Sequence, residues 1–225
     1  MITNSTLGVI GGYGSLASLE FQKILLTSHL HKVSKDSDFP SYILLNVTQG
    51  DIIDLDGTAV NELELFEFLK EHKNTLKNTN EVIILCNSFY YYLESFEKIL
   101  EKNIVSLPDL VEYSISYFDF KRPLIVGSEF TKEYNLYSSS LYEPVFYTNK
   151  NMISESVKGI IEDKYVDDIL LKAKEENVDS IVLACTDLTF YRDILRKKTP
   201  LEIIDSVEVA ASYFTQKGEL NESNK

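Results

Sequence analysis

Residues 81–88 read EVIILCNS, an apolar and mostly β-branched segment that runs into a cysteine and two polar residues. Residues 179–187, DSIVLACTD, repeat this order later in the chain. A short continuous apolar run followed by an amphipathic segment is typical of a strand buried on both faces of a parallel sheet. Cys86 and Cys185 are therefore each expected at the carboxyl end of such a strand, the edge at which ligands bind in α/β sheets.

The likeness between the two stretches continues on both sides of them. After each cysteine come a helix-like segment, a short apolar strand, an aspartate and a second helix-like segment, and before each lies a short strand that ends at glycine, residues 7–12 and 123–128. The sequence thus predicts an α/β fold of two similar parallel-sheet subdomains related by pseudo-two-fold symmetry. The active site is expected in the cleft between them, with Cys86 and Cys185 across it.

The boundaries of these units follow from the same pattern. We expect residues 1–110 to form the N-terminal α/β subdomain, joined by a C-terminal helix of residues 206–225, and residues 111–205 to form the second subdomain. No low-complexity linker separates them, so they are expected to pack as one body. Further predicted elements are a strand over residues 41–46 and helices over residues 16–28, 61–77 and 151–177, the last with a break near 163–165.

Composition narrows the class of function. The chain has 225 residues, 44% of them hydrophobic, and a formal net charge of −13. A nucleic-acid partner is not expected, because such binding needs a basic surface. Neither a membrane span nor a secretory signal is predicted, since the sequence has no long apolar run and no basic region before its first apolar stretch. We therefore expect a cytoplasmic protein.

The two cysteines are the only ones in the chain, and their equivalent positions argue against simple burial as small apolar residues. Each precedes a predicted helix, whose N-terminal end favours a thiolate, so the thiols are expected to ionise more readily than free ones. Two facing thiols suit proton transfer at a carbon acid, in which one thiolate removes a proton from one face and the other thiol protonates the opposite face. No metal-ligand spacing accompanies them.

Four motifs together resemble those of a known family. They are GVIGGYG at residues 8–14, CNS at 86–88, ACTD at 184–187 and PLEIID at 200–205. In order and spacing they are similar to the motifs of the aspartate/glutamate racemase superfamily, in particular its aspartate racemase branch, over nearly the whole chain. The resemblance implies a cofactor-independent amino-acid racemase that forms a homodimer, with Cys86 and Cys185 as the catalytic pair.

By the same resemblance, Asn87, Ser88 and Thr186 would hold the carboxylate and amino group of a small amino-acid substrate, within a wider set of substrate-binding residues. They are Tyr13, Gln49, Asn87, Ser88, Thr131, Lys164, Thr186 and Asp187. Of the aromatic residues 89–92, most are expected to pack a helix against its sheet, with Tyr90 the candidate for a substrate contact.

The sequence departs from the family pattern where specificity is set. Aspartate racemases usually carry an Asp-Arg pair soon after the conserved Gln, but residues 50–54 contain no arginine, so a side-chain carboxylate loses its expected bidentate clamp. Tyr90 stands in place of the family's His. Two alternatives therefore stay open beside the racemase: a small-carboxylate-binding protein without turnover, and a related dicarboxylate isomerase or decarboxylase.

Overall fold

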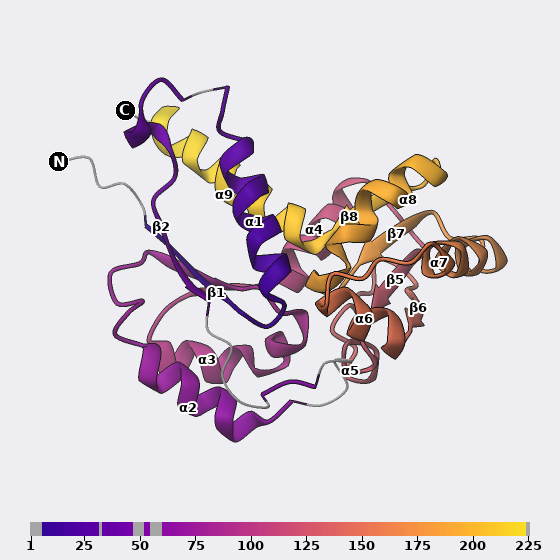
Figure 1. The fold of residues 1–225 in the computed structure, drawn as a ribbon, viewed down its shortest axis with the longest axis horizontal. Helices are drawn as coiled ribbons and strands as arrows, with labels where there is room; N and C mark the ends of the chain where they lie inside the picture. The colour runs from indigo at the N-terminus through magenta and orange to yellow at the C-terminus, as the bar shows by residue number, and fades with distance from the viewer. Residues whose placement is uncertain (1–5, 32, 47–51, 55–59, 224–225) are drawn as a thin grey trace.

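The computed structural model describes residues 6–31, 33–46, 52–54 and 60–223. It contains two four-stranded parallel sheets with helices around them (Figure 1). The predicted fold class is thereby confirmed. In spatial order the first sheet is β2 (Tyr42–Asn46), β1 (Leu7–Gly11), β3 (Glu81–Ile84) and β4 (Ile104–Val105), and the second is β6 (Val145–Thr148), β5 (Pro123–Gly127), β7 (Ser180–Leu183) and β8 (Glu202–Asp205).

The two sheets repeat each other in detail. Both have the same strand order, and in both the ladder extends one hydrogen bond beyond the central strands. The amide of Leu85 donates to the carbonyl of Ile10 at 2.8 Å, and the amide of Ala184 donates to the carbonyl of Val126 at the same distance. Leu85 and Ala184 each directly precede a cysteine, so both cysteines leave their sheets at equivalent points.

Each cysteine is followed by a 3₁₀ helix before the α-helix begins. These turns are η2 (Asn87–Tyr92) before α3 (Leu93–Leu100), and η3 (Thr186–Tyr191) before α8 (Arg192–Lys198). A single predicted helix is thus two segments in each half. Tight 3₁₀ turns are common at the N-terminal ends of α-helices, and here they hold the polar residues after each cysteine close to the sheet edge.

The remaining helices enclose the sheets. They are α1 (Ser15–Thr27), α2 (Glu62–His72), α4 (Leu107–Tyr117), α5 (Glu129–Glu133), α6 (Lys150–Val157), α7 (Asp163–Glu175) and α9 (Ser206–Ser223), with the short 3₁₀ helix η1 (Asp36–Asp38). Helix α9 starts directly after β8 of the second sheet but packs beside α1 of the first half and beside α4 (Figure 1). The C-terminal helix thereby ties the two halves together.

Two further features differ from the sequence prediction. Strand β6 was not predicted, because it is an edge strand whose residues are all only half-buried and so lack a continuous apolar run. The break in the long helix lies over residues 158–162, since Gly159 with its φ of 75° ends the first segment and α7 starts at Asp163. A glycine is favoured there because side chains disfavour this left-handed region.

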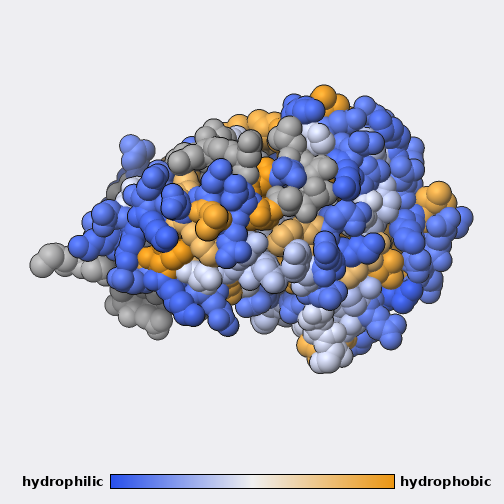
Figure 2. All heavy atoms as spheres, turned by 90° about the horizontal axis from the view of Figure 1, so that it is seen from below, coloured by the Kyte–Doolittle hydropathy of each residue, from blue (hydrophilic) through white to orange (hydrophobic). Residues whose placement is uncertain are grey.

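The core is divided between the two sheets. Every residue of β1, β5 and β7 is buried, which is the burial pattern of parallel strands covered on both faces. The face in Figure 2 is mainly hydrophilic, with apolar residues in small separate patches. Among the described helices, none combines the length and the apolar character needed to span a membrane.

Candidate active site

A cavity of about 250 Å³ lies between the carboxyl ends of the two sheets. Its walls come from both halves of the chain, and it is close to the lower end of the size range of small-molecule sites, about 300–1,000 Å³. Residues central to its chemistry are Gly14, Asp54, Cys86, Ser128, Cys185 and Asp187. The cleft predicted between two related subdomains thus exists, and it contains both cysteines.

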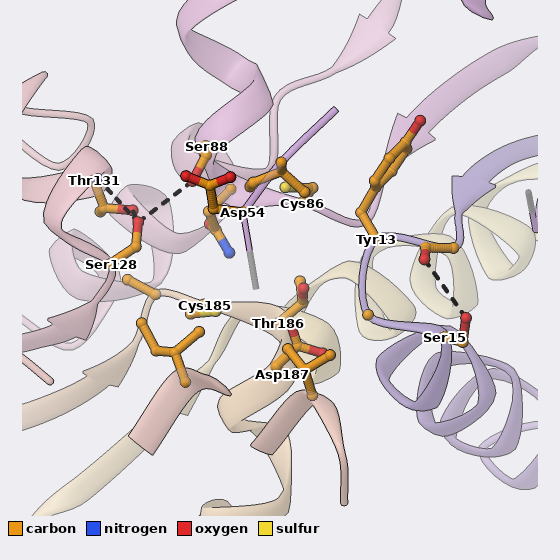
Figure 3. A pocket seen from close by; sticks show the side chains of 17 residues that line it. Tyr13, Ser15, Asp54, Cys86, Ser88, Ser128, Thr131, Cys185, Thr186 and Asp187 are labelled. Carbon is orange, nitrogen blue, oxygen red and sulfur yellow. Dashed lines mark hydrogen bonds between the residues drawn. The ribbon is translucent and has the colours of Figure 1, made fainter. Parts of the chain in front are cut away.

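The two cysteines approach this cavity from opposite sides, Cys86 from the first half and Cys185 from the second (Figure 3). Both are free thiols. Cys86 is 7% exposed, whereas Cys185 is more accessible. This arrangement follows from the repeat. Each cysteine comes directly after the last hydrogen bond of the two central strands of its sheet, and the carboxyl ends of both sheets border the same cavity.

Buried hydrogen bonds hold the residue that follows each cysteine. The hydroxyl of Thr186 donates to the carbonyl of Leu85 at 3.3 Å, and the side-chain amide of Asn87 donates to Ser206 Oγ at 3.3 Å. The buried hydroxyl of Tyr137 donates to the amide oxygen of Asn87. These contacts between the halves are buried, so they fix the orientation of one motif relative to the other.

Three hydroxyl groups line one side of the cavity. Ser88 Oγ lies 3.4 Å from Ser128 Oγ, and Ser128 Oγ lies 3.0 Å from Thr131 Oγ1 (Figure 3). Ser128 also accepts a hydrogen bond from the backbone amide of Thr131 at 3.1 Å, which caps α5. Each hydroxyl can donate as well as accept, so this side of the cavity suits a carboxylate.

The thiols do not ionise readily in this structure, contrary to the sequence expectation. Burial raises the pKa of the Cys86 thiol to about 12, although the backbone amides of Phe89 and Ser88 act in the opposite direction. Burial also raises the pKa of Cys185, and the nearby Asp187 carboxylate raises it further. The helix-end amides were correctly placed, but desolvation outweighs them.

Asp187 is a buried carboxyl group at the edge of the cavity. It is 7% exposed, and its Oδ1 atom has no hydrogen-bond partner among the described residues. Burial raises its pKa to about 7. The carboxylate lies against Gly14, where the backbone φ is 96° and a built Cβ would be 2.3 Å from Oδ1. The glycine turn therefore serves to bring the backbone close to this carboxylate.

Tyr13 lines the cavity, but its ring extends away from the two cysteines (Figure 3). The ring packs edge-on against Phe89 and Phe68, with centroid distances of 4.6 and 6.0 Å. Tyr90, the other aromatic candidate, does not line the cavity. Its hydroxyl bonds to the backbone of Ile84 and Val105, so it holds β3 and β4 together, and its predicted substrate contact is wrong.

The structure brings together most of the residues predicted for the site. Those that line the cavity are Tyr13, Cys86, Asn87, Ser88, Thr131, Cys185, Thr186 and Asp187. Lys164 does not line it: this lysine pairs with Glu162 at the start of α7, and its side chain is 54% exposed. Gln49 lies outside the described residues.

Some lining residues were not among the predicted set. Asp54 and Ser128 add polar groups to the cavity wall, while Ile53, Ile153 and Val157 supply apolar surface. Asp54 and Ser128 each follow the carboxyl end of a strand in sequence, which is the signal that indicates them. No comparable signal marks Ile153 and Val157, because α6 reaches the cavity only through tertiary packing. Within the described part of the chain, no group of His, Cys, Asp or Glu side chains is arranged to hold a metal ion.

Several solved structures have the same architecture as this chain. An aspartate racemase homologue from Pyrococcus horikoshii OT3 superposes with a TM-score of 0.74 at 17% identity, over 96% of this chain and 99% of that chain. A glutamate racemase from Francisella tularensis in complex with D-glutamate gives 0.68 at 15% identity, over 97% of this chain and 82% of that chain. The chain has the fold of the aspartate and glutamate racemases.

An allantoin racemase from Klebsiella pneumoniae also has this racemase fold, with a TM-score of 0.58 at 12% identity over 96% of this chain and 89% of that chain. No protein-family model and no curated protein matches the sequence. At these identities the likeness establishes the architecture, so the chemistry must be argued from the residues in the cavity.

Proposed function

We propose that the protein is a cofactor-independent amino-acid racemase that interconverts L- and D-enantiomers through Cys86 and Cys185. The observation that carries this proposal is that two free thiols, from equivalent positions of a repeated unit, face each other across one small cavity. The fold supports the proposal, since an aspartate racemase homologue, a glutamate racemase and an allantoin racemase have similar structures.

The reaction requires two proton transfers at Cα. The thiolate of one cysteine takes the α-proton, which leaves a carbanion whose charge spreads into the substrate carboxylate. The thiol of the other cysteine then gives its proton to the opposite face of Cα, and this S–H bond breaks as the new C–H bond forms. The net result is inversion with no change in charge, and the roles of the cysteines exchange for the reverse direction.

The polar side chains assign an orientation to the substrate. The α-carboxylate lies against the hydroxyls of Ser88, Ser128 and Thr131, while the α-ammonium group pairs with the unpartnered Oδ1 of Asp187. This ion pair neutralises the carboxylate that raises the pKa of Cys185. Because a cation beside a thiol favours the thiolate, substrate binding itself then lowers the thiol pKa.

A second candidate is a small-carboxylate-binding protein without turnover. The raised pKa of both thiols favours it, because a buried thiol with a pKa of about 12 has almost no thiolate near neutral pH. A binding protein, however, has no evident use for two thiols at equivalent positions. The two candidates differ in one observable, which is exchange of the α-proton.

The test is proton NMR of a mixture of L-amino acids in deuterated buffer with purified, reduced protein and no added cofactor. Loss of an α-proton signal, with appearance of the D-enantiomer on a chiral column, is the expected result and identifies the substrate. Stabilisation of the fold by an amino acid without any loss of its α-proton would instead favour the binding protein.

A further inference from the structure

Among the residues that the structure describes, the cavity wall contains carboxylates but no cation. Asp54 and Asp187 both line it, and no arginine, lysine or histidine is among the described residues of its wall. Asp54 is exposed and Asp187 is buried, and the two side chains lie on opposite sides of the cavity (Figure 3). A substrate bound here therefore meets a carboxyl group on two sides of the cavity.

The arginines of the chain are committed elsewhere. All three form ion pairs outside the cavity wall, so none is available as a clamp for a substrate carboxylate. The pairs are Arg122 with Glu176 at 3.0 Å, Arg192 with Asp205 at 3.0 Å and Glu20 at 3.2 Å, and Arg196 with Glu208 at 2.6 Å.

The segment around Asp54 has the same sign of charge. Residues 47–59 contain Asp51, Asp54 and Asp56 but no lysine, arginine or histidine. Lys164, a lysine among the predicted substrate-binding residues, pairs with Glu162 and does not line the cavity. Neither the cavity wall in the described residues nor the sequence adjoining Asp54 supplies a positive charge.

We propose that the substrate is an amino acid whose side chain carries no carboxylate, and that Asp54 excludes the dicarboxylic amino acids. This inference rests on the proposed function, which already assigns the α-carboxylate to the hydroxyl groups and the α-ammonium to Asp187. The unpartnered, buried Oδ1 of Asp187 accepts one cationic group. A second carboxylate on the substrate would then face Asp54 without a counter-charge, which like-charge repulsion disfavours.

The test compares substrates of nearly equal shape that differ in charge. All the common L-amino acids are incubated with the wild-type protein in deuterated buffer, and the rates of α-proton loss are compared within the pairs asparagine and aspartate, and glutamine and glutamate. We expect exchange to be confined to amino acids without a side-chain carboxylate. In the pair that exchanges faster, the rate of α-proton loss from the amide should exceed that from the acid by about tenfold or more. Fastest exchange of aspartate or glutamate would overturn the inference and leave the proposed racemase intact.

Asp54→Asn provides the matched variant, with Asp119→Asn as its control, because Asp119 is an exposed aspartate that pairs with Lys121 and does not line the cavity. Asp54→Asn is expected to raise the acid-to-amide ratio of kcat/KM by about tenfold, whereas Asp119→Asn leaves the ratio unchanged. An unchanged ratio in Asp54→Asn would contradict the role of Asp54.

Failure of the proposed function is recognised separately. If no amino acid loses its α-proton, the racemase proposal fails, and the thermal midpoint of the wild-type protein is measured with each amino acid at the same concentration. Larger stabilisation by amino acids without a side-chain carboxylate supports the inference in that case. Larger stabilisation by aspartate or glutamate, or none by any amino acid, contradicts it.

Discussion

The hydroxyl of Thr186, directly after Cys185, donates to the carbonyl oxygen of Leu85, directly before Cys86, across a distance of 3.3 Å. Residues from the two halves of the chain thus meet in a buried hydrogen bond that joins the two cysteine turns. Because the bond lies one residue from each sulfur, it sets the separation and the direction of the thiols. We regard it as the contact that makes two similar subdomains into one active site.

Replacing this threonine by valine tests that role. Thr186→Val keeps the shape of the side chain but removes the hydrogen bond to the carbonyl of Leu85. We therefore expect the free energy of unfolding to fall by about 1–3 kcal/mol. Racemisation should fall by at least about tenfold, since small displacements of reacting groups lower rates steeply. Chemical denaturation and the initial rate of enantiomer conversion measure the two effects.

Thr79→Val is the matched control. Thr79 is 3% exposed and donates to the carbonyl of Leu76 at 2.7 Å, at a site remote from the cavity. Its replacement should cause a similar loss of stability with unchanged racemisation. Equal rates in Thr186→Val and Thr79→Val would show that the contact between the two turns does not position the thiols.

Gly14→Ala should damage both the fold and the site. A residue with a side chain loses about 1–2 kcal/mol of stability at the φ of 96° that Gly14 adopts. The added methyl carbon would also lie only 2.3 Å from Asp187 Oδ1, so the carboxylate would have to move. Gly159→Ala is the control, because its φ is 75° and its nearest contact is the end of the Leu16 side chain at 3.1 Å. We expect both variants to lose stability, but only Gly14→Ala to lose most of its racemisation.

Asp187 should make the fold less stable as pH rises. Its pKa is raised from 3.8 to about 7 by burial, so between these values the unfolded chain releases a proton that the folded protein keeps. The stabilising contribution is therefore complete below about pH 4 and is lost as pH rises through about 7, by an amount on the order of 4 kcal/mol. Relative to wild type, Asp187→Asn should gain stability across this window, as measured by denaturation at several pH values.

Asp193→Asn supplies a control of opposite sign. The hydrogen bond from Arg192 lowers the pKa of Asp193, so its contribution to stability is present near neutral pH and is lost as the pH falls through its folded pKa. This variant should be less stable than wild type near neutral pH, and the difference should shrink in acid. A flat difference between Asp187→Asn and wild type from pH 4 to 8 would refute the burial of a titrating carboxyl at residue 187.

Sequence reasoning located the architecture because the signals for it are local. The buried runs before Cys86 and Cys185 show their strand character in apolar, β-branched residues, and the repeat places both at one sheet edge. Strand β6 was missed because its residues are all half-buried at an edge and carry no such run. Asp54 follows the carboxyl end of a strand in sequence, but this signal does not distinguish it from the other polar residues of the same stretch.

Properties that depend on tertiary packing were the least predictable. A cysteine directly before a helix-like segment predicts a lowered thiol pKa. For Cys86, burial by the surrounding elements raises the pKa instead, and the sequence does not show how deep that burial is. Tyr90 shows the same limit. In sequence it occupies a position near the cleft, whereas in the structure its hydroxyl bonds to the backbone of two strands. Lys164 likewise lies in the first turn of a helix whose direction the sequence does not determine.

In the proposed mechanism, Cys86 and Cys185 act as two bases on opposite faces of one carbon. The most direct test is the rate at which the substrate's L- and D-enantiomers interconvert, measured by chiral chromatography for wild type, Cys86→Ala and Cys185→Ala, each shown to be folded by circular dichroism. We predict that wild type converts both enantiomers and that each variant loses at least about 10³-fold in rate. Full racemisation by either folded variant would contradict the two-thiol mechanism.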